Sequence, residues 1–141
     1  MIFFFDTSVL IPAFQQSHTH HEASHLALAR VGHNTAVCGA HSLAEFYAVM
    51  TRLPHPHRLE PDQALMCIEQ IAQRLQVIAL QAQEYLGEAR HAAAGKITGG
   101  RFYDALLLAC ARKASPDRIL TWNKHRFTAL APDLAGRIAT P

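Results

Sequence analysis

The first ten residues, MIFFFDTSVL, constrain the fold more than any other segment, because a short apolar run ends abruptly on an aspartate. Ile2 to Phe5 show no alternation of polar and apolar side chains, which predicts a strand buried on both faces in a parallel sheet. A predicted helix begins at Val9, so Asp6 stands at the carboxyl end of the strand, where open α/β sheets bind ligands. Asp6 is therefore a candidate site residue, although an acidic residue here can also simply cap the helix.

Composition favours one folded domain. Half of the 141 residues are hydrophobic and 17% are charged, which suits a chain with a real core rather than a disordered one. No apolar run approaches the roughly 20 residues that span a bilayer, and the N-terminus lacks the features of a signal peptide. Three widely spaced cysteines, Cys38, Cys67 and Cys110, are typical of reduced thiols. We predict a single cytoplasmic domain over residues 1–141, with no membrane segment.

The net charge of +2 conceals an asymmetry between the two parts of the chain. Residues 1–89 carry four basic and eight acidic side chains, whereas residues 90–141 carry nine basic and three acidic ones. This excess favours a polyanionic partner for the second part, although a solvated basic face would give the same pattern.

Beyond the first strand, the pattern alternates between helices and strands, as in an α/β domain with a mostly parallel sheet. Apolar side chains at spacings of three and four predict helices, and short apolar runs predict strands. The predicted helices cover residues 21–31, 41–53, 61–75, 82–94 and 101–114, and the further strands cover residues 35–38, 77–80 and 119–121. The segment after residue 121 is predicted to be irregular.

Two more acidic residues are candidates. In FYDALLLACA, residues 102–111, the predicted helix is apolar on every side except at Asp104 and the Tyr103 hydroxyl, which predicts burial. A buried carboxylate needs a cation, hydrogen bonds or a wet cleft, and an ion pair with Arg101 is the purely structural explanation. Glu45 lies opposite the apolar stripe of its helix, so it joins a site only if a second surface packs there.

The last informative segment is ILTWNKHRF, residues 119–127. Its predicted strand ends close to a polar residue, Asn123, just as the first strand ends on Asp6. Lys124, His125 and Arg126 then form a cationic cluster suited to phosphate groups.

Together, FFFDTSVL, the glutamate in HSLAEFYAVMTRL, FYDALLLACA and ILTWNKHRF resemble, in this order, the motifs of PIN-domain nucleases, especially the VapC-type toxin ribonucleases. Each motif is short, but four in order across almost the whole chain form a fairly specific signal. The resemblance implies one three-layer α/β/α domain with a mostly parallel central sheet. It also implies metal-dependent hydrolysis of RNA by an endoribonuclease that is the toxin of a type II toxin–antitoxin pair.

The resemblance assigns the catalytic carboxylates and the metal ligands. Asp6, Glu45 and Asp104 match the first three acidic positions around Mg²⁺ or Mn²⁺, cations that prefer oxygen ligands. The fourth acidic position falls on Asn123, whose amide oxygen can ligate but carries no charge. This departure from the fullest motif puts a second tightly held metal ion in doubt.

The same resemblance implies supporting residues and partners. Ser8 matches a hydroxyl beside the site, and Thr121, at the end of the last predicted strand, is the second supporting residue. Arg101, Lys124 and Arg126 are the candidates for holding the RNA backbone without reading its sequence. The implied partners are an RNA substrate, a cognate antitoxin and a second copy of the chain in a homodimer.

Three other functions remain open. HEASH at residues 21–25 matches the HExxH pattern of zinc hydrolases, but no third ligand follows at a recognisable spacing. Phosphotransferases of the haloacid-dehalogenase type also begin with a strand and an aspartate, but they need a second aspartate where Ser8 stands. A non-catalytic PIN-like module that binds RNA or protein is the third, although a polyanion-binding module gains nothing from clustered negative charge.

Overall fold

The computed structural model describes all residues, Met1–Pro141, and its centre is a five-stranded sheet in which every strand pair is parallel. The order across the sheet is β3-β2-β1-β4-β5, so the predicted first strand is central. The strands are β1 (Phe3–Phe5), β2 (Ala36–Gly39), β3 (Gln76–Ile78), β4 (Arg118–Leu120) and β5 (Ile138–Ala139).

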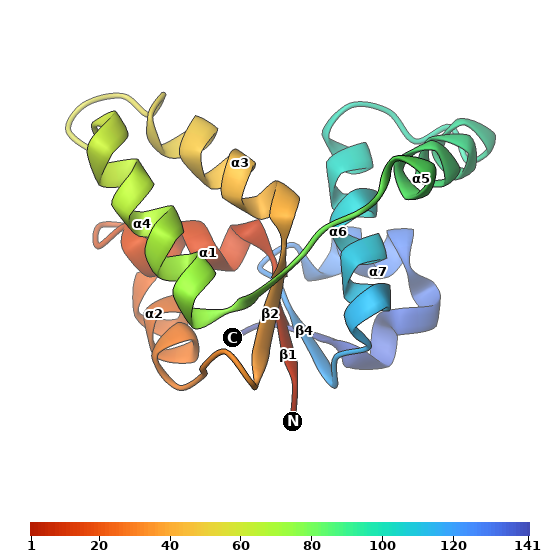
Figure 1. The fold of residues 1–141 in the computed structure, drawn as a ribbon, viewed down its shortest axis with the longest axis horizontal. Coiled ribbons are helices and arrows are strands. Elements are labelled where there is room, and N and C mark those ends of the chain that lie inside the picture. Colours follow the sequence, from red (N-terminus) through yellow and green to blue (C-terminus); the bar gives the residue numbers. More distant parts are fainter.

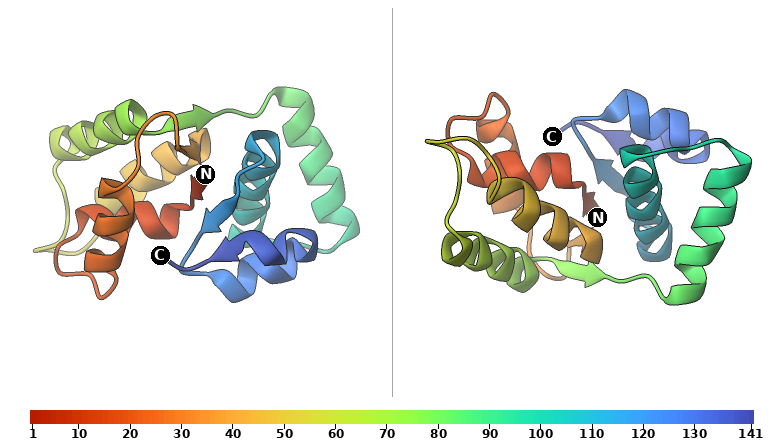
Figure 2. Two further views of the ribbon diagram at one scale, coloured as in Figure 1. Left: turned by 90° about the horizontal axis from the view of Figure 1, so that it is seen from below. Right: turned by 90° about the horizontal axis from the view of Figure 1, so that it is seen from above.

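Helices cover both faces of this sheet, which confirms the predicted three-layer architecture (Figure 1). One face carries α1 (Thr7–Phe14), α2 (His21–Ala29), α3 (Ala40–Met50) and α4 (Pro61–Arg74). The other carries α5 (Ala82–Ala94), α6 (Gly100–Ala114) and α7 (Lys124–Leu130). The views from below and above show the same division, with the sheet between the two sets of helices (Figure 2). The helices lack the combination of length and hydropathy that a membrane span requires.

Alternation along the strands builds two separate cores. On β1, Phe4 belongs to the core under α6 and α7, while Phe5 belongs to the core under α1, α3 and α4. Both rings are fully buried. Successive side chains of a strand point to opposite faces, so an unbroken apolar run is what a doubly covered strand requires.

The C-terminal segment corrects the sequence-based prediction, because it is not irregular. It contains α7, a 3₁₀ helix over Pro132–Arg137 and the edge strand β5. These elements are too short for a clear hydrophobic period, since α7 buries only Phe127 and β5 has two residues. Their order comes from packing, because Phe127 and Ile138 both join the core on the α6 side of the sheet.

The topology creates a switch point beside β1. The chain runs outward through β2 and β3 on one side of β1, and then through β4 and β5 on the other. The chain leaves β1 and β2 through α1 and α3 into one helical layer, whereas it leaves the neighbouring β4 through α7 into the other layer. Ligands of open α/β sheets bind at such a point.

Close approach of α6 to β2 predicts opposite effects for two glycine-to-alanine substitutions. A Cβ on Gly39, the last residue of β2, would lie 2.8 Å from Cδ2 of the buried Leu107, whereas one on Gly87 in α5 meets nothing within 4 Å. Gly39→Ala should lower the free energy of unfolding by about 1–3 kcal/mol through overpacking. Gly87→Ala should raise it by about 0.5–1 kcal/mol through helix propensity. Urea melts of both variants measure these changes, and a stable Gly39→Ala protein would contradict the packing argument.

Candidate active site

The ends of β1, β2 and β4 each lead into a helix, and two of the candidate residues, Asp6 and Asn123, sit at these junctions. Asp6 is the N-cap of α1, Gly39 precedes α3, and Asn123 is the N-cap of α7. Asp6 gives no side-chain cap to α1, so the capping role considered from the sequence is not what its carboxylate does. Its side chain is instead part of a network between strand ends.

Two hydroxyl groups hold the Asp6 carboxylate. Ser8 Oγ and Thr121 Oγ1 donate to the same oxygen, Oδ2, over 2.6 and 2.8 Å. Each hydroxyl is itself fixed from the β4 end, because the Trp122 amide donates to Ser8 Oγ and the Asn123 amide donates to Thr121 Oγ1. The structure thus brings Ser8 and Thr121 to Asp6, while Oδ1 takes no part in this hydroxyl network.

Burial makes Asp6 an unusual acid. The residue is 2% exposed, and this desolvation raises the pKa of its carboxyl group from an ordinary 3.8 to about 6. The two hydroxyl bonds lower that pKa, whereas the nearby charge of Asp104 raises it. The native fold therefore holds a carboxylate that is ionised at pH 7 but has no cationic side chain to compensate its charge.

Glu45 reaches the same region through the packing of α3 against α1. Thr7 Oγ1 donates to Glu45 Oε1 over 3.2 Å, and the buried Ser42 hydroxyl lies 2.7 Å from Thr7 Oγ1. Because the single Thr7 proton points to the carboxylate, Ser42 is the donor in the second bond. Burial raises the pKa of Glu45, and the charge of Asp104 raises it further. Sequence periodicity alone placed Glu45 on a solvated face, and the contact with α1 changes that environment.

Asp104 lies in the first turns of α6 and is 7% exposed. Its ion-pair partner is Arg126 of α7, whose Nε lies 2.6 Å from Asp104 Oδ2. The contact is close, but Oδ2 has no partner with the directionality of a hydrogen bond. Arg101, the partner considered from the sequence, acts only as a nearby charge that lowers the pKa of Asp104. Desolvation outweighs both arginines, and the pKa of Asp104 is raised.

The three carboxylates influence one another without forming a finished cage. The charge of Asp104 raises the pKa of both Asp6 and Glu45. Nevertheless, no three His, Cys, Asp or Glu side chains converge tightly enough to count as a metal-binding cluster. Hydroxyl groups occupy one side of Asp6 and Glu45, and a guanidinium occupies Asp104. The site is therefore a group of acids whose negative charge is only partly compensated, by the single arginine Arg126 beside Asp104.

The predicted basic residues fall on two sides of this group. Lys124 is exposed in the first turn of α7, and Arg101 is exposed in the first turn of α6. Arg126 is half exposed, so its guanidinium touches both Asp104 and solvent. Asn123 contributes its backbone amide to Thr121, and its side chain makes no hydrogen bond within the protein.

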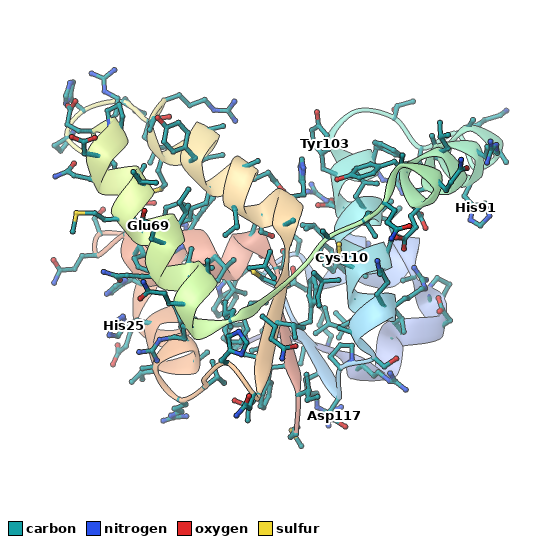
Figure 3. The ribbon with its side chains drawn as sticks, viewed as in Figure 1. His25, Glu69, His91, Tyr103, Cys110 and Asp117 are labelled. Carbon is teal, nitrogen blue, oxygen red and sulfur yellow. The ribbon has the colours of Figure 1, made fainter.

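The HExxH motif does not assemble a zinc site. Nδ1 of His21 lies 2.7 Å from the Pro12 carbonyl oxygen, so it carries a proton and binds the backbone of α1. His25 stacks on His21 with ring centroids 5.4 Å apart, towards the left edge of Figure 3. No third ligand joins them.

Sequence reasoning missed Trp122, which ties α2 to the end of β4. Its indole Nε1 donates to the buried Ser24 over 2.8 Å, and its ring stacks on His20 with centroids 3.7 Å apart and planes 9° apart. Because the same residue's amide holds Ser8, α2 and the Asp6 network are linked. The aromatic residue between Thr121 and Asn123 was the available signal.

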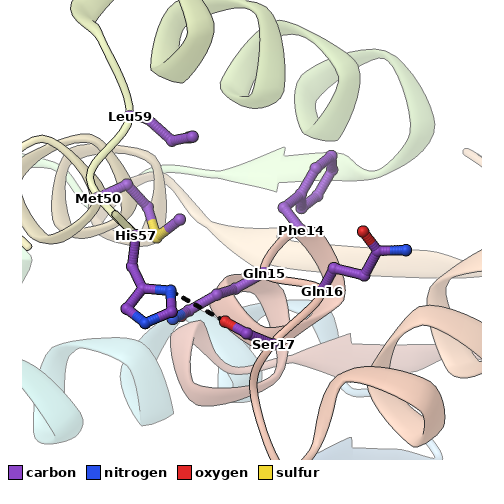
Figure 4. Close-up of a pocket in the computed structure, with 7 residues that line it drawn as sticks. All are labelled: Phe14, Gln15, Gln16, Ser17, Met50, His57 and Leu59. Atoms are coloured by element: carbon purple, nitrogen blue, oxygen red, sulfur yellow. Dashed lines mark hydrogen bonds between the residues drawn. The ribbon is translucent and has the colours of Figure 1, made fainter. Parts of the chain in front are cut away.

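One surface hollow lies apart from these residues. It is lined by the end of α1 and the loop after α3, and Ser17 Oγ lies 3.0 Å from His57 Nδ1 within it (Figure 4). None of the candidate carboxylates borders it. The hollow therefore adds nothing to the acidic group.

Comparison with known proteins shows the family. The PIN-domain family model matches residues 3–131. Ribonuclease VapC40 of Mycobacterium tuberculosis is 40% identical over 116 residues, 82% of each chain, and ribonuclease VapC27 of the same species is 41% identical over 107 residues, 75% of this chain and 74% of the relative.

Two solved structures share the fold at low sequence identity. The crystal structure of M. tuberculosis VapC20, a sarcin–ricin loop cleaving toxin, aligns with a TM-score of 0.70 at 16% identity over 90% of this chain and 94% of that one. VapBC2 from Rickettsia felis, bound to a DNA fragment from its promoter, aligns with a TM-score of 0.63 at 17% identity over 99% and 98%. The chain therefore belongs to the PIN-domain family, among relatives named VapC ribonucleases.

Proposed function

We propose that this protein is a toxin ribonuclease that hydrolyses RNA phosphodiester bonds with the help of Mg²⁺ or Mn²⁺ held by Asp6, Glu45 and Asp104. The observation that carries the proposal is the meeting of three acids near the end of β1: Asp6 is buried there, Glu45 accepts a hydrogen bond from the next residue, Thr7, and the charge of Asp104 raises the pKa of both carboxyl groups. Perturbed acids gathered at a switch point are typical of catalytic sites. A purely RNA-binding module has no use for them beside a polyanion.

The donor set fits a hard dication. All three side chains offer carboxylate oxygens, and Asn123 offers an amide oxygen at the N-cap of α7. Their mutual repulsion and burial are what a bound cation relieves. When bound, Mg²⁺ or Mn²⁺ would supply an activated water and charge neutralisation at the phosphoryl oxygens.

The hydroxyl groups near the carboxylates orient them, and the basic residues are assigned to the RNA backbone. Ser8 and Thr121 orient Asp6 through Oδ2, and Thr7 orients Glu45. Arg126 supplies the positive charge that Asp104 has in the structure. Because Arg126 is half exposed, its guanidinium can leave Asp104 for an RNA phosphate when another cation neutralises the carboxylate. Lys124 and Arg101 extend the basic surface for the backbone.

We also infer the partners and location from the family. A cognate antitoxin would cover the acidic group, and a second copy of the chain would complete a homodimer. The three cysteines are free, and burial raises the pKa of Cys38 to about 12 and of Cys110 to about 11. Such thiols are inert at neutral pH, as suits a reducing cytoplasm.

Cleavage of RNA is the direct test. Parent protein should cut single-stranded RNA in Mg²⁺ or Mn²⁺ and stop in EDTA. Asp6→Asn, Glu45→Gln and Asp104→Asn should each lower the rate about a hundredfold, the upper scale for loss of a residue that supports a metal ion. Asp133→Asn is the matched control, because Asp133 forms only an exposed ion pair with Arg112. EDTA-resistant cleavage, or equal activity in all four variants, would contradict the proposal.

Asp6→Asn should stabilise the metal-free protein. The pKa of the Asp6 carboxyl group is higher in the native protein than in the unfolded chain. Its ionisation therefore lowers the free energy of unfolding, fully above about pH 6, and this loss disappears below the ordinary pKa of 3.8. In EDTA at pH 7, the variant should gain up to about 3 kcal/mol in the free energy of unfolding, and the gain should shrink as the pH falls through this window. Urea melts at pH 7 and pH 4 measure it.

The same variant should lose the response to metal. Mn²⁺ stabilises only the folded parent that binds it, so thermal melts should show a rise for the parent and little for Asp6→Asn. A variant that is less stable than the parent in EDTA, together with a parent that ignores Mn²⁺, would make Asp6 a structural residue.

Arg126 and Lys124 should separate metal binding from RNA binding. Arg126→Ala frees Asp104 from its ion pair. Because a half-exposed ion pair contributes up to roughly 1 kcal/mol, the Mn²⁺ concentration at half-maximal thermal stabilisation should fall by up to about fivefold. Lys124→Ala should leave that midpoint unchanged. In both variants, the slope of the logarithm of RNA affinity against the logarithm of salt concentration should fall by about one, the share of one phosphate contact. Arg30→Ala, on the C-cap of α2, is the control. An unchanged Mn²⁺ midpoint in Arg126→Ala would mean that the guanidinium does not compete for Asp104.

A further inference from the structure

Tyr103 is an exposed aromatic residue immediately beside the acidic group. It precedes Asp104 in α6, and 48% of its surface is exposed although Asp104 itself is buried. Figure 3 shows it near the upper end of α6, on the side where the ribbons of α3 and α6 diverge. Neither the proposed chemistry nor the fold uses this ring, since it belongs to neither hydrophobic core.

A second ring fixes the position of Tyr103. His41, in the first turn of α3, stacks on it with centroids 4.6 Å apart and planes 29° apart. His41 Nε2 in turn lies 3.6 Å from Glu45 Oε1 and has no hydrogen-bond partner. The Tyr103 ring is therefore supported from α3 and joined through His41 to the carboxylate region.

The other neighbour of Tyr103 is a shallow hollow between α5 and α6. Its lining includes Ala92 and Ala93 of α5, Ile97 of the connecting loop, and Gly100 and Phe102 of α6. Small side chains and a glycine leave the flank of the Tyr103 ring open. The hollow is thus apolar, has an aromatic wall and lies next to Asp104.

Basic side chains stand on both sides of the hollow in the sequence. Residues 89–103 include Arg90, Lys96 and Arg101 but no acidic residue, and Glu88 and the buried Asp104 bracket this segment. Lys96 and Arg101 are both exposed and directly flank lining residues in the sequence. An occupant with an aromatic, apolar part and a negatively charged part satisfies both features, and a nucleotide has this combination.

We propose that Tyr103, supported by His41, is a stacking site for an unpaired nucleobase of single-stranded RNA next to the scissile phosphate, with Arg101 and Lys96 on the adjoining backbone. The inference rests on the proposed ribonuclease function and deepens it. Base–aromatic stacking tolerates every base, so this site selects unpaired RNA over duplex RNA and does not read sequence. Duplex bases are already stacked and cannot reach the ring.

Steady-state cleavage of a short single-stranded RNA tests the site. Tyr103→Ala should raise KM about tenfold, within the range measured for loss of one base–aromatic stack, while kcat changes little. Tyr103→Phe, which keeps the ring, should stay within about twofold of the parent. Tyr85→Ala is the matched control, because Tyr85 is 40% exposed on α5 but does not line the hollow. Metal-free thermal melts should show that all three variants are folded.

Abasic substrates identify the contact itself. Removing one base beside the cut should raise the parent's KM as much as Tyr103→Ala does, and the two changes together should have no further effect. Equal sensitivity of the parent and Tyr103→Ala to every abasic position, or an unchanged KM in Tyr103→Ala, would overturn the stacking site. A change in oligomeric state in Tyr103→Ala, with unchanged RNA affinity, would assign the ring to a protein interface and overturn it too.

Failure of the nuclease itself would look different. Parent protein would then leave RNA intact in both Mg²⁺ and Mn²⁺, whatever residue stands at 103. Fluorescence anisotropy with labelled single-stranded RNA in EDTA still tests stacking, because binding needs no cleavage. In EDTA, Tyr103→Ala should lower the affinity for the single-stranded RNA about tenfold and leave the affinity for a duplex of the same sequence unchanged. Equal losses on both, or none on either, would refute the inference independently of catalysis.

Discussion

Burial of the Asp6 carboxylate at the centre of the sheet is the constraint on which the rest of the site depends. A charge there can persist only where neighbouring groups supply hydrogen bonds, and the hydroxyl groups of Ser8 and Thr121 both donate to its Oδ2. Those bonds lower the pKa of Asp6 but do not cancel the desolvation that raises it. The remaining electrostatic deficit is what makes the position suitable for a cation.

Arg126 illustrates how the protein manages this deficit in its metal-free form. A guanidinium beside Asp104 limits repulsion among the acids, yet its half-exposed position makes the contact weak and reversible. A fully buried arginine would have closed the site, because breaking a buried pair leaves an uncompensated charge. The placement on α7, a short helix at the end of β4, therefore keeps the acidic group available.

Much of the fold could be predicted from the sequence. The run from Ile2 to Phe5 predicted a doubly buried central strand, and the structure confirms this for the part that forms β1, while Ile2 lies outside the strand and is exposed. The apolar helix around Asp104 predicted burial, which the structure confirms. The C-terminal elements could not be predicted, since a seven-residue helix and a two-residue strand have no period to detect. Nor could the partner of Asp104, because an ion pair between residues 104 and 126 depends on how α7 packs against α6. The environment of Glu45 likewise depends on Thr7, a contact between two helices that neither helix reveals alone.

The edge strand β5 has a consequence for synthesis on the ribosome. The amide of Thr121 donates to the carbonyl oxygen of Ala139 over 3.0 Å, so one of the two hydroxyl donors to Asp6 is anchored by the last strand of the sheet to be synthesised. Domains emerge from the ribosome N-terminus first, at about 5–20 residues per second. The half of the site built by α1 and α3 can therefore form early, while the Thr121 support is completed only when residue 139 has emerged. The Asp6 carboxylate of a nascent chain therefore gains its full support only after the edge strand β5 has joined the sheet.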